Sequence, residues 1–214
     1  SMTNYALLLI EDNNLEEAKK YLFKASELND KSSYYHIAKL YENNGNKEDA
    51  LKYYKLSANE AKNLKAMKKC AELTDNVDDK IKYYELLINT YNSSNLSFSS
   101  SSSSSILSPS IDPKNYYIAL NNLGKIYLNL NKKKEALKCF KEATKDQNIE
   151  YYYNYAKLTD DESEKCKFYK LCADFNIGID QNFVNDSNIE IQAESSSNEL
   201  LTKVKSSQNI INNI

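Results

Sequence analysis

The segment LGKIYLNLNKKKEALKCFKEA, residues 123–143, contains small and apolar residues at helical spacing on both sides of a polar break. These residues are, in chain order, Leu123, Gly124, Tyr127, Ala136, Phe140 and Ala143. Spacings of three and four residues place side chains on one face of a helix. The segment therefore predicts two helices joined by a short turn, with small residues where the helices pack closely and an aromatic ring beside them.

The same pattern recurs along the chain. The small residue that anchors the first helix of each copy is Ala38, Ala71, Gly124 or Ala156, so the steps are 33, 53 and 32 residues. The long step contains residues 93–113, which include seven consecutive serines at 99–105. Without that insert the period is uniform. An earlier copy at 4–27 keeps the spacing, so we expect five units in all.

These residues resemble the tetratricopeptide repeat family. The unit at 117–150 contains the family's L-G-x-x-Y…A-x-x-x-F-x-x-A pattern, and the unit at 31–64 follows it with Ile37, Ala38 and Tyr41, then Ala50, Tyr54 and Ser57. The family's tryptophan and terminal proline are missing, and KYYKLSA (52–58) is also similar to the related Sel-type repeats. The resemblance implies an all-α fold, a right-handed α-solenoid of about five antiparallel helix-turn-helix repeats.

The expected organisation follows from the repeat. The repeat domain spans 3–174, with units at about 3–30, 31–64, 65–92, 114–147 and 148–174. We interpret 93–113 as a serine-rich mobile insert, because serines bury too little apolar surface to offset the entropy of ordering. Residues 175–214 are interpreted as a linker and a candidate C-terminal capping helix.

Composition argues against several classes of function. The formal net charge is −2 and all 28 basic residues are lysine, which is unlike a nucleic-acid-binding surface. No apolar run approaches the ~20 residues that span a membrane. With one histidine, His36, and no phosphate-binding or zinc-binding motif, we expect no catalysis, no cofactor and no metal site. His36 is interpreted as a half-buried or surface packing residue.

The cysteines bear on the compartment. The chain has four, Cys70, Cys139, Cys166 and Cys172, and none forms a C-x-x-C pair. Each falls within a predicted helix. We interpret them as reduced core residues of an intracellular, cytoplasmic protein.

The resemblance also implies a function, that of a protein–protein interaction scaffold. In this family the first helix of each unit lines a concave groove. The candidate partner-binding residues on that face are Tyr35, Lys39, Asn43, Lys65, Lys69, Asn121, Asn122, Lys125, Asn129, Asn154 and Lys157. Lysine and asparagine side chains favour an extended acidic or polar peptide segment.

Three alternatives remain open. One is a helical-repeat RNA-binding protein, and another is a non-catalytic regulatory subunit of a larger enzyme complex. The third is self-association through an uncapped end of the solenoid.

Overall fold

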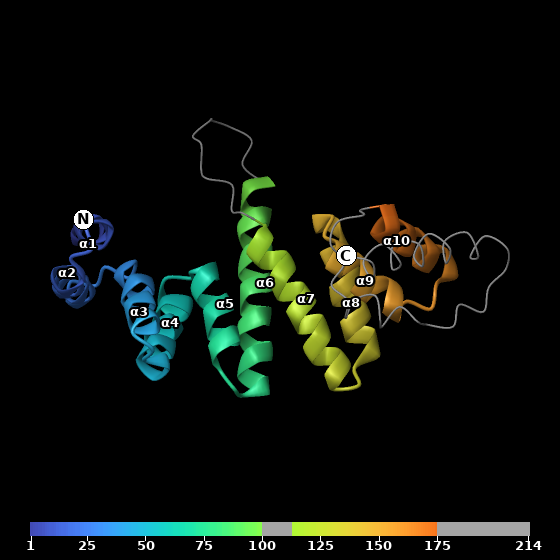
Figure 1. The fold of residues 1–214 in the computed structure, drawn as a ribbon, viewed down its shortest axis with the longest axis horizontal. Helices are drawn as coiled ribbons and strands as arrows, with labels where there is room; N and C mark the ends of the chain where they lie inside the picture. The colour runs from blue at the N-terminus through green and yellow to red at the C-terminus, as the bar shows by residue number, and fades with distance from the viewer. Residues whose placement is uncertain (100–112, 175–214) are drawn as a thin grey trace, which may run out of the picture. The chain divides into compact units, whose positions relative to one another are not determined.

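The computed structural model describes residues 1–99 and 113–174, and every regular element in these ranges is helical (Figure 1). The first range contains α1 (Met2–Glu11), α2 (Leu15–Glu27), α3 (Ser33–Asn43), α4 (Lys47–Glu60), α5 (Leu64–Leu73) and α6 (Val77–Ser99). The second contains α7 (Lys114–Asn129), α8 (Lys133–Ala143), the 3-10 turn η1 (Thr144–Asp146), α9 (Ile149–Leu158) and α10 (Glu162–Asp174). The predicted all-α fold is confirmed, whereas the candidate capping helix lies outside the described residues.

The chain divides into two compact units, residues 1–126 and 127–214, with the boundary inside α7. In the first unit the helices pack in chain order, each of α1 to α5 against the helix that follows it. In the second unit α8 packs on α9, and α9 on α10. Packing between successive helices is the arrangement of a helical-repeat solenoid, in which each repeat buries its apolar face on its neighbours.

The turns after α1, α3 and α7 share one geometry. Each contains a residue with positive φ: Asn13 (61°), Gly45 (75°) or Asn131 (57°). The next amide then donates back across the last turn, as Asn46 N does to Tyr41 O at 2.9 Å. Glycine and asparagine tolerate this left-handed conformation, so the break NNGN (43–46) ends α3 where the sequence predicted.

The ends of α5 and α9 differ from those turns. Their C-caps, Thr74 and Thr159, are extended, with ψ of 143° and 139°. In each case the threonine Oγ1 accepts a hydrogen bond from the amide two residues on, that of Asn76 or Asp161. An extended cap needs no left-handed residue. Each of these connections has three residues, as in the other units, and the short units are shorter because α5 and α9 end two residues after Ala71 and Ala156, whereas α3 ends five residues after Ala38.

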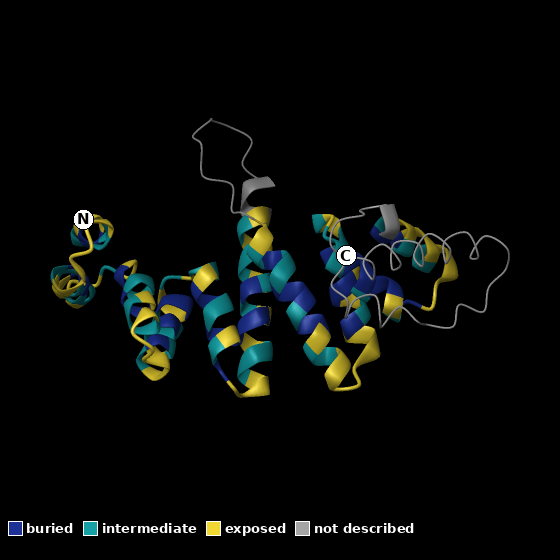
Figure 2. Cartoon of the chain, in the orientation of Figure 1, coloured by how far each residue is buried: buried dark blue, intermediate teal, exposed yellow. Residues whose placement is uncertain are grey.

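The core consists of the small and aromatic residues that the repeat pattern predicted (Figure 2). Ala38, Ala50 and Tyr54 are fully buried in the first unit, as is Ala136 in the second, where Phe140 is 1% exposed. Alanine lets two helices approach closely, and the ring fills the remaining space. In the second unit Phe140 joins three of the four tyrosines of α9 and two side chains of α10 in one cluster.

Helix α6 is longer than the sequence suggested. It continues to Ser99, so residues 93–99 of the expected insert are helical. Ser93 Oγ donates to Asn89 O at 2.8 Å and Ser94 Oγ to Thr90 O at 2.9 Å, so the hydroxyl groups bond to the helix's own carbonyls. Residues 100–112 lie outside the described residues.

Candidate functional site

The first-helix face of the first unit contains a hydrogen-bonded group centred on Glu42 of α3. Lys69 Nζ of α5 lies 2.7 Å from Glu42 Oε1, and Tyr54 of α4 donates its hydroxyl to Glu42 Oε2 at 2.6 Å. One carboxylate therefore joins three helices from two consecutive units. Lys69, a predicted partner-binding residue, is already used within the protein.

The electrostatics of this group follow from its contacts. Partial burial opposes the charged form of Glu42, but the hydrogen bonds from Lys69 and Tyr54 outweigh it and lower the pKa of the carboxyl. The hydrogen bond to Glu42 raises the pKa of Lys69. Burial and the Glu42 charge raise the pKa of Tyr54 above its ordinary range. The lysine and the carboxylate both stay charged, and the phenol stays protonated, at neutral pH.

Two other lysines that were predicted on the same face are more exposed to solvent than Lys69. Lys39 of α3 and Lys65 of α5 are exposed, and neither forms a salt bridge with any residue that the structure describes. Three residues after Lys65, Lys68 pairs with Glu72 at 3.7 Å. The face thus combines two satisfied ion pairs with two exposed ammonium groups.

Tyr35 supplies an aromatic surface beside these charges. Its ring is half-buried, 5.7 Å from the ring of Tyr54 and 5.5 Å from that of His36. His36 is half-buried, as predicted, and burial lowers the pKa of its imidazole. Asn43, the last predicted residue on α3, is exposed at the end of the helix.

The predicted amides of α7 are less accessible than the sequence suggested. Asn121 is only 3% exposed, and the half-buried Asn122 donates from Nδ2 to the hydroxyl of Tyr84 at 3.0 Å. Asn122 therefore faces Tyr84 of α6, and Asn121 is shielded from solvent. Lys125 is exposed.

The other predicted residues belong to the second unit. Asn129 is exposed at the end of α7, and Asn154 is half-buried in α9. Lys157 is exposed, with its Nζ 5.7 Å from the centre of the Tyr153 ring. These three residues thus belong to residues 127–214, whereas the group around Glu42 belongs to residues 1–126.

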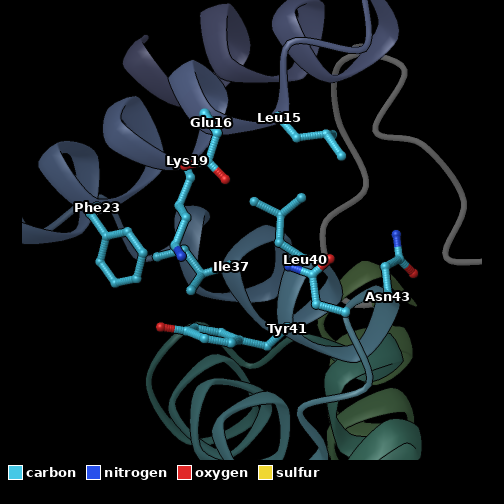
Figure 3. A pocket seen from close by; sticks show the side chains of 9 residues that line it. Leu15, Glu16, Lys19, Phe23, Ile37, Leu40, Tyr41 and Asn43 are labelled. Atoms are coloured by element: carbon cyan, nitrogen blue, oxygen red, sulfur yellow. The ribbon is translucent and has the colours of Figure 1, made fainter.

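Sequence reasoning missed a cavity between α2 and α3 (Figure 3). It has a volume of about 40 Å³ and is bordered by Leu15, Glu16, Lys19, Phe23, Ile37, Leu40, Tyr41, Asn43 and Asn44. Apolar side chains from both helices point into it, and Lys19 Nζ lies 5.6 Å from the centre of the Tyr41 ring. Only Asn43 was among the predicted residues. The signal that could have revealed the cavity is Leu15, an apolar residue at the first position of a helix.

The potential metal ligands and thiols can be placed in the part of the chain that the structure describes. No group of three or more histidine, cysteine or acidic side chains in these residues could hold a metal ion. Burial raises the pKa of the Cys70 and Cys172 thiols to about 12, so neither is a nucleophile at neutral pH. Cys139 is also buried, but Cys166 is exposed. The prediction that all four cysteines are core residues was therefore wrong for Cys166, which lies on an exposed side of α10.

The membrane prediction can be examined in the same residues. Among the described helices, none is both long and apolar enough to cross a bilayer.

The sequence matches a known protein family in three of its repeat units. Family models described as tetratricopeptide repeat match residues 1–32, 31–64 and 117–147. No curated protein matches the chain in sequence. Proteins built from such repeats are generally non-catalytic scaffolds for protein interactions.

Several solved structures share the fold. An assembly chaperone of RpL4, Acl4, is 13% identical with a TM-score of 0.66, and the match covers 95% of this chain and 83% of the other. The MamA protein is 14% identical with a TM-score of 0.56, over 91% and 96% of the two chains. PilF of Pseudomonas aeruginosa is 16% identical with a TM-score of 0.52, over 86% and 78%. At these identities the likeness concerns the fold alone. Residues 1–64 and 117–147 thus match tetratricopeptide repeats, as the sequence pattern predicted, and the chain has the fold of a helical-repeat protein.

Proposed function

We propose that this chain is a scaffold that binds an extended, acidic segment of a protein partner on the face formed by α3 and α5. One observation supports this most directly. Lys39 and Lys65 are exposed and form no salt bridge with the described residues, while their neighbours Lys68 and Lys69 are paired with Glu72 and Glu42. Carboxylates of a partner would pair with these two lysines through charge-assisted hydrogen bonds.

The paired residues have a different role in this proposal. Tyr54, Glu42 and Lys69 hold α3, α4 and α5 together, so the spacing of Lys39 and Lys65 is set before the partner arrives. A surface that needs no rearrangement loses less conformational entropy on binding. The half-buried ring of Tyr35 adds apolar contact for a main chain that lies along the face.

The remaining predicted residues extend the proposal. Lys125 occupies in its unit the position of Lys39, and Lys157 the corresponding position in the last unit. Each is a candidate contact for an acidic segment within its own compact unit, Lys125 in residues 1–126 and Lys157 in residues 127–214. The proposal also keeps the division into five units at about 3–30, 31–64, 65–92, 114–147 and 148–174.

Fluorescence anisotropy with labelled ten-residue peptides tests the proposal. The probes are a peptide rich in aspartate and glutamate, a serine and glutamine peptide of equal length, and a lysine-rich peptide. We expect the acidic peptide to bind most tightly. The double variant Lys39→Glu, Lys65→Glu should weaken it about tenfold or more, since two attractions become repulsions.

The control must carry the same change of charge elsewhere. Lys20→Glu with Lys138→Glu serves, because both lysines are exposed on second helices, α2 and α8. This variant should bind the acidic peptide as the wild type does. Equal affinity for all three peptides, or equal loss in both variants, would refute the proposal. Preference for a labelled single-stranded RNA over the acidic peptide would support the RNA-binding alternative instead.

A further inference from the structure

The cavity between α2 and α3 is open to solvent at an apolar edge. Leu15 is 43% exposed, and the Leu40 side chain opposite it is half-buried. Leu15 and Leu40 face each other across the opening in Figure 3. Exposed leucine at the rim of a cavity leaves apolar surface in water, and that surface gains free energy when it is covered.

This opening differs from the equivalent position in two other units. Leu15 is the first residue of α2, and the first residues of α4 and α8 are Lys47 and Lys133. Those lysines form exposed ion pairs, Lys47 with Asp75 at 3.4 Å and Lys133 with Asp160 at 2.8 Å. At the α2–α3 contact a leucine replaces the lysine, and a cavity takes the place of the ion pair.

The size of the cavity limits what can fill it. Small-molecule and cofactor sites usually occupy about 300–1,000 Å³, and an engineered cavity of about 150 Å³ holds one benzene ring. A volume of about 40 Å³ accommodates one or two methyl-sized groups. The tip of a leucine, isoleucine or methionine side chain fits that description, and a cofactor does not.

The cavity is continuous with the face proposed to bind the partner. Asn43 lies four residues after Lys39, on the same side of α3, and is both a predicted partner-binding residue and part of the cavity wall beside Leu40. A chain bound at Lys39 therefore reaches the opening within one turn of α3.

We propose that the partner segment carries one apolar anchor residue, leucine, isoleucine or methionine, next to its acidic residues, and that this anchor enters the cavity between Leu15 and Leu40. This inference rests on the proposed function, because it names the sequence character of the same partner. It turns a general preference for acidic segments into a short motif of carboxylates flanking an aliphatic side chain.

The test compares two labelled ten-residue peptides with the full chain. Both are rich in aspartate and glutamate, and one has a single central leucine where the other has alanine. Burial of the leucine tip should make the leucine peptide bind about tenfold more tightly. Methyl resonances of Leu15 and Leu40 should shift with the leucine peptide and stay in place with the alanine peptide.

Two variants separate the parts of the site. Leu15→Lys introduces the residue type found at the equivalent positions of α4 and α8, and should abolish the advantage of leucine while leaving the alanine peptide unaffected. Leu8→Lys is the matched control, since Leu8 is 57% exposed on α1 and does not border the cavity. It should preserve the advantage. Lys39→Glu with Lys65→Glu should weaken both peptides.

The outcomes distinguish the two proposals. If both peptides bind the wild type with equal affinity, the anchor is wrong and the acidic-segment proposal survives. If neither binds, both proposals fail. If the leucine peptide is preferred but Leu8→Lys removes the preference as fully as Leu15→Lys does, the anchor binds elsewhere and the assignment to this cavity is overturned. Because the peptide comparison uses the wild type, it holds even where a variant does not fold.

Discussion

The helices α4 to α6 and α8 to α10 repeat the same set of inter-unit contacts in two parts of the chain. Each set has two lysine–carboxylate pairs: Lys47–Asp75 and Lys55–Asp79 in the first, Lys133–Asp160 and Lys141–Glu164 in the second. Corresponding residues are 85 or 86 positions apart. The contacts that hold one unit to the next are therefore duplicated almost residue by residue.

The caps are duplicated as well. Asn63 and Asn148 each cap the following helix with a side-chain oxygen, accepting from the amides of Ala66 and Glu150. The residue before each has positive φ, 53° at Lys62 and 48° at Gln147. Matching left-handed residues that are not glycine indicate that the local backbone was copied together with the side chains.

The contacts between repeats are the same in both parts of the chain, but the side chains on the faces of the first helices differ. In α5 this face includes Lys68, Lys69 and Glu72, and the corresponding positions of α9 hold Tyr153, which is only 6% exposed, Asn154 and Lys157. The scaffold contacts must satisfy the same packing in both places, whereas an outward side chain faces no such requirement. The face of α5 is therefore charged, whereas in α9 a buried tyrosine stands at the position of Lys68.

The strongest test of the equivalence is the aromatic residue of each second helix. Tyr54 and Phe140 are 0% and 1% exposed and occupy corresponding positions. Replacing either by alanine leaves a cavity, so each variant should lose about 3–5 kcal/mol of unfolding free energy, measured by urea denaturation followed by circular dichroism. Tyr53→Ala is the control, since Tyr53 is only partly buried against Phe23 and Tyr41, and it should lose less. A much smaller loss for Phe140→Ala than for Tyr54→Ala would break the equivalence.

A smaller effect should come from the hydroxyl that distinguishes the two rings. Tyr54→Phe makes this position like that of Phe140 and removes the hydrogen bond to Glu42, which should cost about 1 kcal/mol at neutral pH. The pKa of Glu42 is lowered in the folded protein, so its charged form stabilises the fold above the ordinary glutamate range. That stabilisation is lost as the pH falls through the lowered pKa.

The difference between wild type and Tyr54→Phe should therefore be largest at neutral pH and shrink in acid. Urea denaturation at a series of pH values measures it. The same series in a Glu42→Gln background is the control, and there the difference should no longer follow pH. A pH-independent cost of Tyr54→Phe with Glu42 present would mean that the hydroxyl contributes by packing and not through the carboxylate.

Much of this scaffold could be predicted from the sequence, because it depends on spacing. Alanine at positions three and four apart, and Gly45 after α3, determine close helix packing and the turn without reference to distant residues. The candidate site was harder to predict. Helical spacing shows that Lys69 and Asn121 lie near the first-helix face, but not that Glu42 takes up Lys69 or that Asn121 is buried. Those outcomes depend on which side chains meet across helices. The α2–α3 cavity was missed for the same reason.

The smallest effect should come from the duplicated ion pairs themselves. Lys55 lies 3.2 Å from Asp79, and their side chains are 38% and 35% exposed, so Lys55→Met should cost about 0.2–1 kcal/mol in low salt. The Lys141–Glu164 pair is 3.0 Å long, but its lysine is 61% exposed, and Lys141→Met should cost less. Methionine retains most of the apolar stem, so the measurement isolates the charge. Both costs should fall when about 0.5 M sodium chloride is added. At roughly 0.1 M salt the Debye length is about 10 Å, and it is shorter at the higher concentration. A loss of stability that does not change with salt would show that these lysines contribute through the packing of their apolar stems. The contact repeated between the two parts of the chain would then be a packing contact and not an ion pair.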